Sequence, residues 1–160
     1  MPTSLRAIEP APPERLIALL RDADEDECRI ACAVGDPAHT GWIAADDAGE
    51  IGAVLVHWDA AESEIVYIAV TAARRGQGFG RALVEQVIDR AREVGTQRLC
   101  VGTANSSLEN IAFYQKCGFR MDRVRQDYFA YLPHPVYEHG IRVRDMLVFT
   151  LDLQVGSSAD

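Results

Sequence analysis

The sequence of 160 residues is poor in cysteine. Its four cysteines are too few for a disulfide-dense scaffold, and none of them forms a C-x-x-C motif. Cys28 and Cys32 stand one helical turn apart, but no second pair of Cys or His at ligand spacing accompanies them. We therefore interpret both as ordinary packing residues and expect no metal site.

Long apolar runs are also missing. The N-terminal stretch MPTSLRAIEPAPPERL lacks the apolar core of a signal peptide. No apolar segment approaches the ~20 residues that a membrane-spanning helix needs. We therefore expect no membrane partner and a cytoplasmic location.

Positive charge is scarce as well. Lys and Arg number 16 against 24 Asp and Glu, which gives a net charge of -8. Nucleic-acid binding needs clustered positive charge on a basic domain, so no nucleic-acid partner is expected. An acidic surface suits a cationic or amine-bearing partner and equally serves solubility, so the charge leaves both readings open.

The remaining composition is that of an ordinary globular protein, with 48% hydrophobic and 25% charged residues. A chain of this length buries roughly 70% of the surface that its unfolded form exposes. It contains no internal repeat, low-complexity segment or interdomain linker. We therefore expect residues 1–160 to form a single domain.

Hydrophobic periodicity predicts alternating strands and helices. Strands are predicted at residues 4–10, 62–71, 97–104, 119–129 and 141–153, and as a hairpin over 41–59 with its turn at 46–49. Helices are predicted at 13–23, 79–94 and 107–117. Gly95 and Gly118 serve as helix terminators, and Ser106 with Glu109 as a capping box. The stretch 24–41 stays ambiguous, and the order of elements favours one mixed α/β layer.

Three glycines, Gly76, Gly78 and Gly80, lie between the strand at 62–71 and the helix at 79–94. A strand that enters a helix through such a turn aims several backbone N–H groups at one point, where the helix dipole adds positive charge. Glycine permits a close approach of the backbone and positive φ. The sequence therefore predicts a phosphate-binding loop.

Three phosphate-binding patterns compete for this loop. A P-loop requires Gly-Lys-Ser/Thr, whereas Gly78 is followed by Phe79, Gly80 and Arg81, and the G-x-G-x-G spacing fits the dinucleotide fingerprint poorly. The pattern Arg75-x-x-Gly78-x-Gly80 resembles the R/Q-x-x-G-x-G/A signature with which the GNAT acyl-CoA N-acyltransferase superfamily holds the pyrophosphate of coenzyme A.

Two further stretches carry this resemblance. SEIVYIAVT resembles the family's fourth strand, and NIAFYQKCGF resembles its Y-x-K-x-G-F helix and strand entry. The likeness covers residues 50–153 and is sharpest over 62–119. TANSSLENIAFYQKCGFRM and HGIRVRDM also resemble a bacterial group of GNAT proteins described as predicted acetyltransferases, which supports the fold without naming an acceptor.

The resemblance implies an α/β (α+β) fold of the GNAT type, with a mixed central sheet of about six to seven strands flanked by helices. It implies an acetyl-CoA-dependent N-acetyltransferase in which an amine of a small molecule or protein attacks the thioester directly in a ternary complex. It also favours a homodimer. A catalytically lapsed CoA-binding regulatory module is the alternative, while a ligand-free scaffold would leave the glycines unexplained.

Two side chains are candidates for catalysis. Tyr114, at the motif tyrosine, is implied to protonate the departing CoA thiolate, and its alternative role is that of a core aromatic. Glu64 is the candidate base for the amine, whose solution pKa of about 10.4 requires deprotonation before attack. Period-two alternation predicts that Glu64 shares a strand face with Val66, Ile68 and Val70. Its alternative role is that of a solvated carboxylate.

The resemblance also implies a set of cofactor-binding residues in which backbone groups rank above arginine side chains. The main-chain N–H near Val70 is the candidate oxyanion donor, and Asn105 has the alternative role of a turn residue. The set is Ile68, Ala69, Val70, Arg75, Gly76, Gln77, Gly78, Phe79, Gly80, Arg81, Asn105 and Asn110.

The loop over residues 128–140 is implied to border the acceptor site. His134, Glu138 and His139 stand at H-x-x-x-E-H spacing, which does not match a zinc motif. His57 and the two tryptophans are assigned to packing.

Overall fold

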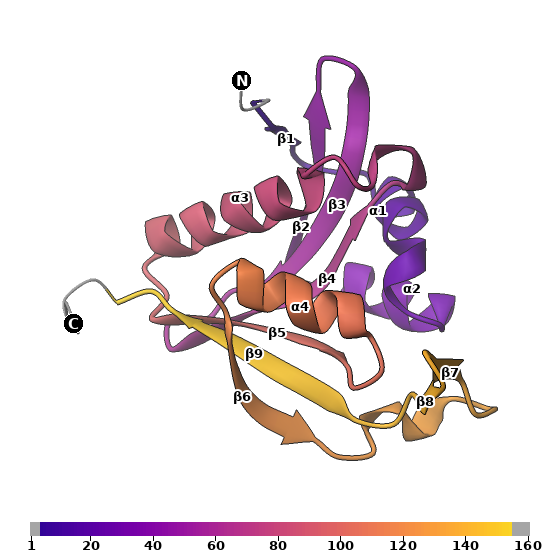
Figure 1. Ribbon diagram of the computed structural model, residues 1–160. Coiled ribbons are helices and arrows are strands. Elements are labelled where there is room, and N and C mark those ends of the chain that lie inside the picture. Colours follow the sequence, from indigo (N-terminus) through magenta and orange to yellow (C-terminus); the bar gives the residue numbers. More distant parts are fainter. Residues whose placement is uncertain (1–3, 155–160) are drawn as a thin grey trace. The chain divides into compact units, whose positions relative to one another are not determined.

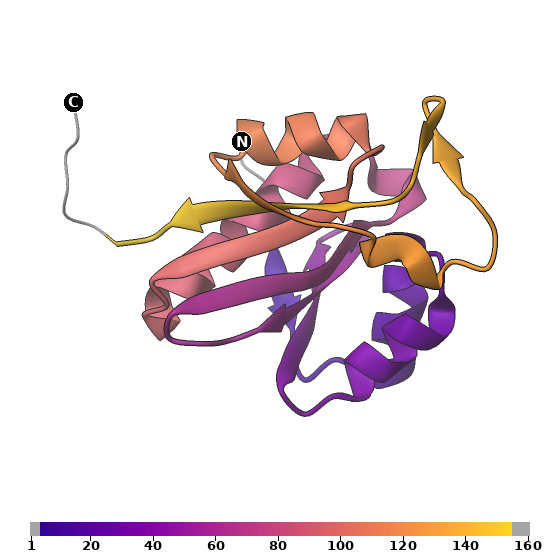
Figure 2. The ribbon, with the colours of Figure 1, turned by 90° about the horizontal axis from the view of Figure 1, so that it is seen from below.

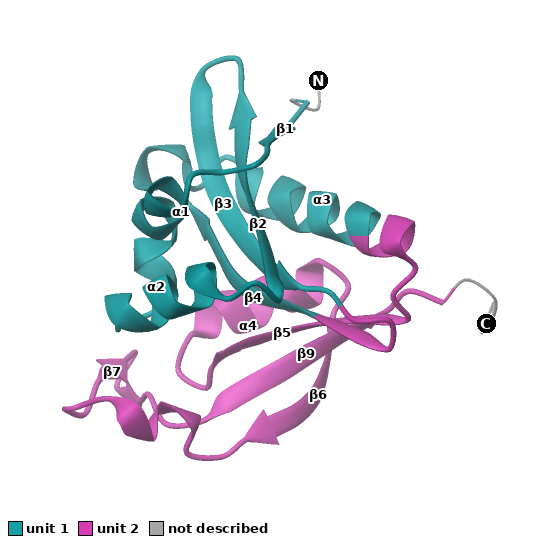
Figure 3. Cartoon of the chain, turned by 180° about the vertical axis from the view of Figure 1, so that it is seen from behind, with its two compact units in different colours: residues 1–58, 64–90 teal, residues 59–63, 91–160 magenta. Residues whose placement is uncertain are grey.

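The computed structural model describes residues 4–154, and the chain divides into two compact units. Unit 1 comprises the described residues up to 58 together with 64–90, and unit 2 comprises 59–63 with the described residues from 91 onward (Figure 3). Among the described residues, no helix has both the length and the apolar character needed to cross a membrane.

Four antiparallel strands form the sheet of unit 1, in the order β1-β2-β3-β4 (Figure 1). They are β1 (Arg6–Ile8), β2 (His39–Asp46), β3 (Gly49–His57) and β4 (Glu62–Val70), whose first two residues belong to unit 2. The predicted hairpin is confirmed: Asp46 Oδ1 accepts a 2.9 Å hydrogen bond from the Ala48 N–H, and Gly49 has a φ of 127°.

Helices cover both faces of this sheet. They are α1 (Pro13–Leu20), α2 (Glu27–Gly35) and α3 (Phe79–Val94), with the short turns η1 (Arg21–Ala23) and η2 (Ala72–Arg74). Leu16 and Leu20 of α1 pack with Ile43 of β2 in one buried cluster. On the opposite face, Trp42 of β2 donates a 2.8 Å hydrogen bond to Gln86 of α3.

The ambiguous stretch 24–41 contains α2. Asp26 caps this helix by accepting a hydrogen bond from the Cys28 N–H, and Ile30 is fully buried. Cys28 and Cys32 are exposed, so their interpretation as packing residues is wrong. The helical spacing places both on one face, which is the solvent side of α2.

In unit 2, the strands run antiparallel in the order β5-β9-β6, and α4 covers one face of them (Figures 1 and 2). The elements are β5 (Arg98–Ala104), α4 (Leu108–Lys116), β6 (Arg120–Arg125), η3 (Tyr128–Tyr131), β7 (Tyr137–Glu138), β8 (Ile141–Arg142) and β9 (Met146–Asp152). The seven strands of the two sheet segments agree with the expected six to seven.

The last two predicted strands are too long, the first at its C-terminal end and the second at its N-terminal end. The strand predicted over 119–129 ends at Arg125, and the one predicted from Ile141 begins at Met146. Residues 141–142 pair with 137–138 as a separate hairpin. Asp127 has a φ of 54°, a left-handed conformation that does not continue a strand.

The helix terminators behave as predicted, whereas the capping box does not. Gly95 and Gly118 have φ values of 79° and 98°. The N-cap of α4 is Ser107, without a side-chain capping bond. The hydroxyls of Ser106 and Ser107 lie 3.3 and 3.1 Å from carboxylate oxygens of Glu138 instead, so a tertiary contact replaces the local one.

Candidate active site

The glycine-rich segment forms an open loop between β4 and α3. The sequence offers positive φ as a reason for all three glycines, and Gly76 and Gly78 have φ values of 72° and 85°, whereas Gly80 is not in this region. A Cβ built at either position would meet no atom within 4 Å, so backbone conformation and not crowding requires glycine there. Gly80 lies in the first turn of α3.

The N–H groups of residues 76–81 all lack a hydrogen-bond partner among the described residues. The first amide of this region that makes a bond of α3 is that of Ala82, which donates to the Gly78 carbonyl at 3.2 Å. Residues 76–78 are exposed. Six successive main-chain donors thus have no partner within residues 4–154 at a point where the helix carries about half a positive charge, an arrangement suited to binding phosphate.

Arg74 fixes one side of this loop. Its guanidinium forms an ion pair with Asp46 at the end of β2 and lies 4.5 Å from the ring centroid of Phe79. The hydrogen bond from Arg74 lowers the pKa of the Asp46 carboxyl below its ordinary value. Asp46 therefore stays ionised at neutral pH and holds Arg74 against the start of α3.

Arg75 fixes the other side. Its Nε donates to the Val70 carbonyl at 3.0 Å, and its Nη2 donates to Asp22 of η1 at 2.7 Å. The arginines beside the loop are thus engaged with groups of unit 1. The loop is shaped by its own chain before any ligand binds.

The backbone of β4 presents alternate residues to its two edges. The Thr71 N–H donates to the Ile51 carbonyl at 2.8 Å, and Val70 stands opposite Gly52. In an antiparallel ladder, the backbone groups of Val70 and Ile68 therefore point away from β3, whereas those of Ala69 point toward it. Of these three predicted cofactor-binding residues, two offer backbone groups at the edge remote from β3.

A β-bulge lies at Val66 in β4. Residues 55 and 56, which are adjacent in β3, pair with Tyr67 and Ile65, so Val66 has no direct partner across the strand pair. The extra residue interrupts the period-two alternation of the strand.

The bulge overturns the predicted face of Glu64. Glu64 pairs with His57 and therefore lies on the face of Tyr67, which packs against the core under α1 and α2. Ile68 and Val70, with which period two groups it, lie on the opposite face. The half-buried Glu64 is thus a neighbour of His57, a residue that the sequence assigns to packing. The strand register is the signal that reveals this proximity.

Tyr114 lies in α4 of unit 2 and is 5% exposed. Its ring packs against those of Phe119 and Phe149, with centroids 5.9 and 6.1 Å away. Burial raises the pKa of its phenol above the ordinary value. No hydrogen bond to the hydroxyl occurs among the described residues, and no fully buried side-chain oxygen there lacks a partner, so the hydroxyl retains the residual exposure. The phenol therefore stays protonated at neutral pH, and its raised pKa makes it a weaker acid than a solvated tyrosine.

Asn105 and Asn110 have different surroundings. Asn105 Oδ1 accepts from the N–H groups of residues 144 and 145 at 2.9 and 3.0 Å, and its Nδ2 donates to the Arg142 carbonyl at 3.0 Å. Asn110 is exposed and donates to Thr103 at 3.3 Å. Asn105 thereby joins the end of β5 to the segment before β9, and its contact with CoA stays a prediction.

The predicted acceptor loop, residues 128–140, makes side-chain contacts with α4 and with the serines that precede this helix. His139 Nε2 lies 2.9 Å from Glu109 of α4, and Glu138 accepts the two serine hydroxyls before this helix. The β7–β8 hairpin is therefore anchored to the element that carries Tyr114.

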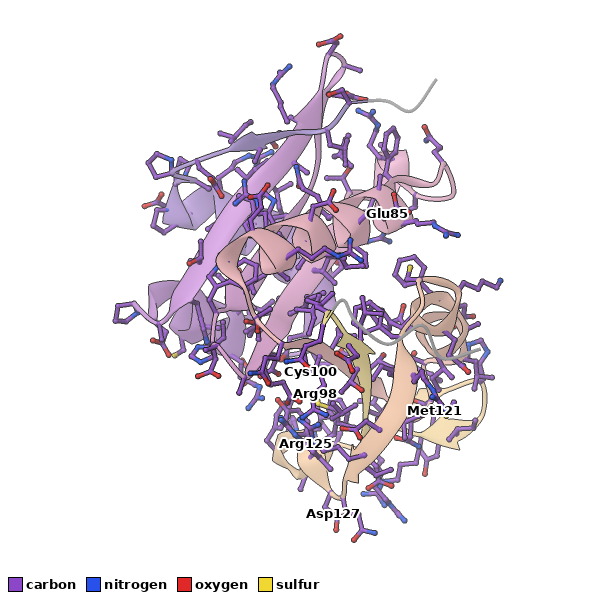
Figure 4. The ribbon with its side chains drawn as sticks, turned by 90° about the vertical axis from the view of Figure 1, so that its left-hand side faces the viewer. Glu85, Arg98, Cys100, Met121, Arg125 and Asp127 are labelled. Carbon is purple, nitrogen blue, oxygen red and sulfur yellow. The ribbon has the colours of Figure 1, made fainter. Side chains whose placement is uncertain are left out.

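A further polar cluster of unit 2 lies around Glu62. Its carboxylate accepts from Arg98 at 2.9 Å and from Arg123 at 2.7 Å, beside the buried Cys100 (Figure 4 labels Arg98 and Cys100). Within residues 4–154, no group of three or more His, Cys, Asp or Glu side chains is arranged to hold a metal ion.

A glycine loop with unpartnered amides at a helix N-terminus, on a strand and helix framework, defines an α/β protein whose loop has the arrangement expected of a phosphate-binding site. Residues 5–119 match the model of the acetyltransferase (GNAT) family. The chain belongs to this family, as its sequence motifs predict.

The relatives agree with this assignment. YvbK of Bacillus subtilis strain 168, described as an uncharacterized N-acetyltransferase, is 37% identical over 138 residues, which are 86% of this chain and 87% of YvbK. A GNAT acetyltransferase from Elizabethkingia anophelis, crystallised with acetyl-CoA bound, has a TM-score of 0.83 and 30% identity over 94% of this chain and 97% of that one.

A B. subtilis acetyltransferase in complex with CoA has a TM-score of 0.84 and 29% identity over 95% and 99% of the two chains. The predicted fold class is confirmed, and the chain is an acyltransferase of the N-acetyltransferase type.

Proposed function

We propose that this protein transfers the acetyl group of acetyl-CoA to a primary amine by direct attack in a ternary complex. The six unpartnered amides of residues 76–81 carry the proposal, because they form a ready site for the diphosphate of the cosubstrate. The family match spans residues of both units, which supports their working as one catalytic domain.

The acceptor class follows from charge and family. YvbK is described as an N-acetyltransferase, and the net charge of -8 favours cationic amines over anionic acceptors. The acceptor is therefore proposed to be an amine of a small molecule or a protein. The homodimer and the cytoplasmic location stay predictions.

The proposed binding mode of acetyl-CoA uses main-chain groups first. The amides from Gly76 to Arg81 hold the diphosphate, and the outward backbone groups of Ile68 and Val70 hydrogen-bond the pantetheine arm. Ala69 lies between them, and its backbone groups point toward β3 and pair β4 with that strand. Asn105 and Asn110 are proposed as further CoA contacts.

The chemistry is assigned to three groups. Glu64 removes a proton from the ammonium, directly or through water, so that the nitrogen lone pair attacks the thioester carbon. The N–H of Val70 stabilises the oxyanion. When the intermediate collapses, the C–S bond breaks, and the Tyr114 phenol gives its proton to the CoA thiolate. The attacking nitrogen loses its second proton to solvent as the amide forms, and the tyrosinate regains a proton from solvent. The raised pKa of Tyr114 keeps the phenol protonated at neutral pH.

Binding and transfer are tested separately. Acetyl-CoA should raise the melting temperature, while ATP and NAD should not, because a ligand that binds only the native state stabilises it. Release of free thiol with a panel of amines then measures transfer. If acetyl-CoA binds but no amine in the panel causes thiol release, the lapsed CoA-binding module is favoured instead. If acetyl-CoA does not bind at millimolar concentration, both hypotheses are refuted.

A further inference from the structure

Three titratable side chains stand in one row across the sheet of unit 1. The strand register places His39 of β2 opposite His57 of β3, and His57 opposite Glu64 of β4. Directly opposite residues of antiparallel strands share a face, with Cβ atoms roughly 5 Å apart. The two imidazole rings meet edge to face, with centroids 5.8 Å apart. The register therefore places the candidate base next to His57 and His57 next to His39.

The backbone of α2 fixes the protonation pattern at the far end of the row. His39 Nδ1 lies 2.8 Å from the Ala33 carbonyl oxygen. A carbonyl oxygen only accepts, so Nδ1 carries a hydrogen, and the Nε2 of a neutral His39 keeps its lone pair. His39, His57 and Glu64 are all half-buried, so water has access to part of the row.

Acetyl transfer to an amine requires a group that accepts a proton, and the row contains three side chains of this kind. Each turnover must remove a proton from an ammonium group before attack. A carboxylate in water has a pKa of about 4.3 and an imidazole about 6.5, so a proton that reaches a carboxylate passes on favourably to a neighbouring neutral imidazole. A carboxylate backed by imidazole therefore returns quickly to its basic form.

We propose that His57 takes over the proton that Glu64 removes from the acceptor ammonium. The inference rests on the proposed function. The N–H bond breaks and its electron pair stays on nitrogen as the nucleophile, while the proton moves to the Glu64 carboxylate and then to an imidazole nitrogen of His57. The resulting imidazolium returns its proton to solvent. Because His57 acts through Glu64, it is a positioning residue, and His39 is its ring neighbour on β2.

The groups around His57 are compatible with this role. On its own sheet it faces an imidazole from β2 and a carboxylate from β4, and α2 contributes a neutral carbonyl to the row through His39. Among the described residues, the row does not form a metal-binding group.

Single and double variants test the relay. His57→Gln is expected to lower kcat about tenfold, below the effect of a full general base, with an unchanged KM for acetyl-CoA. It should also move the acid limb of the kcat–pH profile. The double variant with Glu64→Gln should be no slower than Glu64→Gln alone, because both residues serve one proton path.

Chemical rescue separates the relay from a structural role. Imidazole added to His57→Gly is expected to restore part of kcat near neutral pH, whereas it should not change the rate of Glu64→Gln. His57→Phe keeps an aromatic ring without a proton acceptor, so it should remain slow and gain nothing from imidazole.

The outcomes distinguish the relay from the function on which it rests. A His57→Gln enzyme with wild-type kcat and pH profile would overturn the relay alone. Wild-type turnover by Glu64→Gln would overturn the base assignment together with the relay. If the wild-type protein binds acetyl-CoA but none of the amines in the panel causes release of free thiol, the proposed function fails. The relay then fails with it.

Discussion

Replacement of Gly78 by alanine is the most direct test of the phosphate loop. Its φ of 85° lies where an L-residue costs about 1–2 kcal/mol, while the space around a new Cβ is open. For a chain of this size, that loss corresponds to a fall of about 2–8 °C in melting temperature. Relief of the strain would turn the peptide units of the loop and misdirect their amides.

The expected loss of binding follows from the amides. A hydrogen bond to a charged group contributes about 1.5–3 kcal/mol, so misdirecting one of them should weaken acetyl-CoA binding about 10- to 100-fold. Isothermal titration calorimetry measures this change directly.

Gly95 offers a matched control at the other end of α3. Its φ is 79°, and a Cβ there would also meet no atom within 4 Å. Gly95→Ala should therefore lower the melting temperature by a similar amount and leave the acetyl-CoA affinity at the wild-type value. Unchanged affinity in Gly78→Ala, or an equal loss in both variants, would refute the assignment of the loop to the diphosphate.

Three other substitutions address the remaining parts of the site. Tyr114→Phe should lower kcat about 100-fold or more with little change in acetyl-CoA affinity, because the ring packing is kept and only the proton donor is lost; equal kcat in steady-state assays would remove its role as acid. Asp46→Asn should lower the melting temperature at neutral pH by releasing Arg74. Since the folded-state pKa of Asp46 is lowered, its contribution is present above the ordinary Asp pKa of about 3.9 and is lost as the pH falls through the folded value, so melting curves of variant and wild type should converge in acid; a constant difference would contradict this linkage. Asn105→Ala leaves two N–H groups and a carbonyl without partners and should cost about 1–3 kcal/mol in urea unfolding, whereas an unchanged midpoint would show that water replaces these bonds.

Local patterns predict those parts of the structure that local physics determines. The hairpin turn needs only a short stretch with Asp and a positive-φ glycine, and the helix ends at Gly95 and Gly118 need only a residue that tolerates the left-handed region. The glycine loop is of the same kind, because φ and the helix N-terminus are properties of adjacent residues.

Features that depend on contacts between residues far apart in the sequence cannot be predicted from local patterns. The bulge at Val66 reflects pairing with β3, which no period within β4 discloses. The serines before α4 bond Glu138, which lies some thirty residues away, in place of the local N–H group. The row of His39, His57 and Glu64 likewise exists only after the strand register is known.

The two arginines beside the glycine loop are paired with carboxylates, so their side chains are not the main source of attraction for an anionic ligand. Arg74 with Asp46 and Arg75 with Asp22 are pairs without net charge, so the amides and the end of α3 supply the positive potential. In a protein of net charge -8, an anionic cosubstrate gains little from long-range attraction. Affinity must therefore come from donors that are already aimed, and the two ion pairs serve that purpose by holding the loop in shape and reducing the entropy lost on binding.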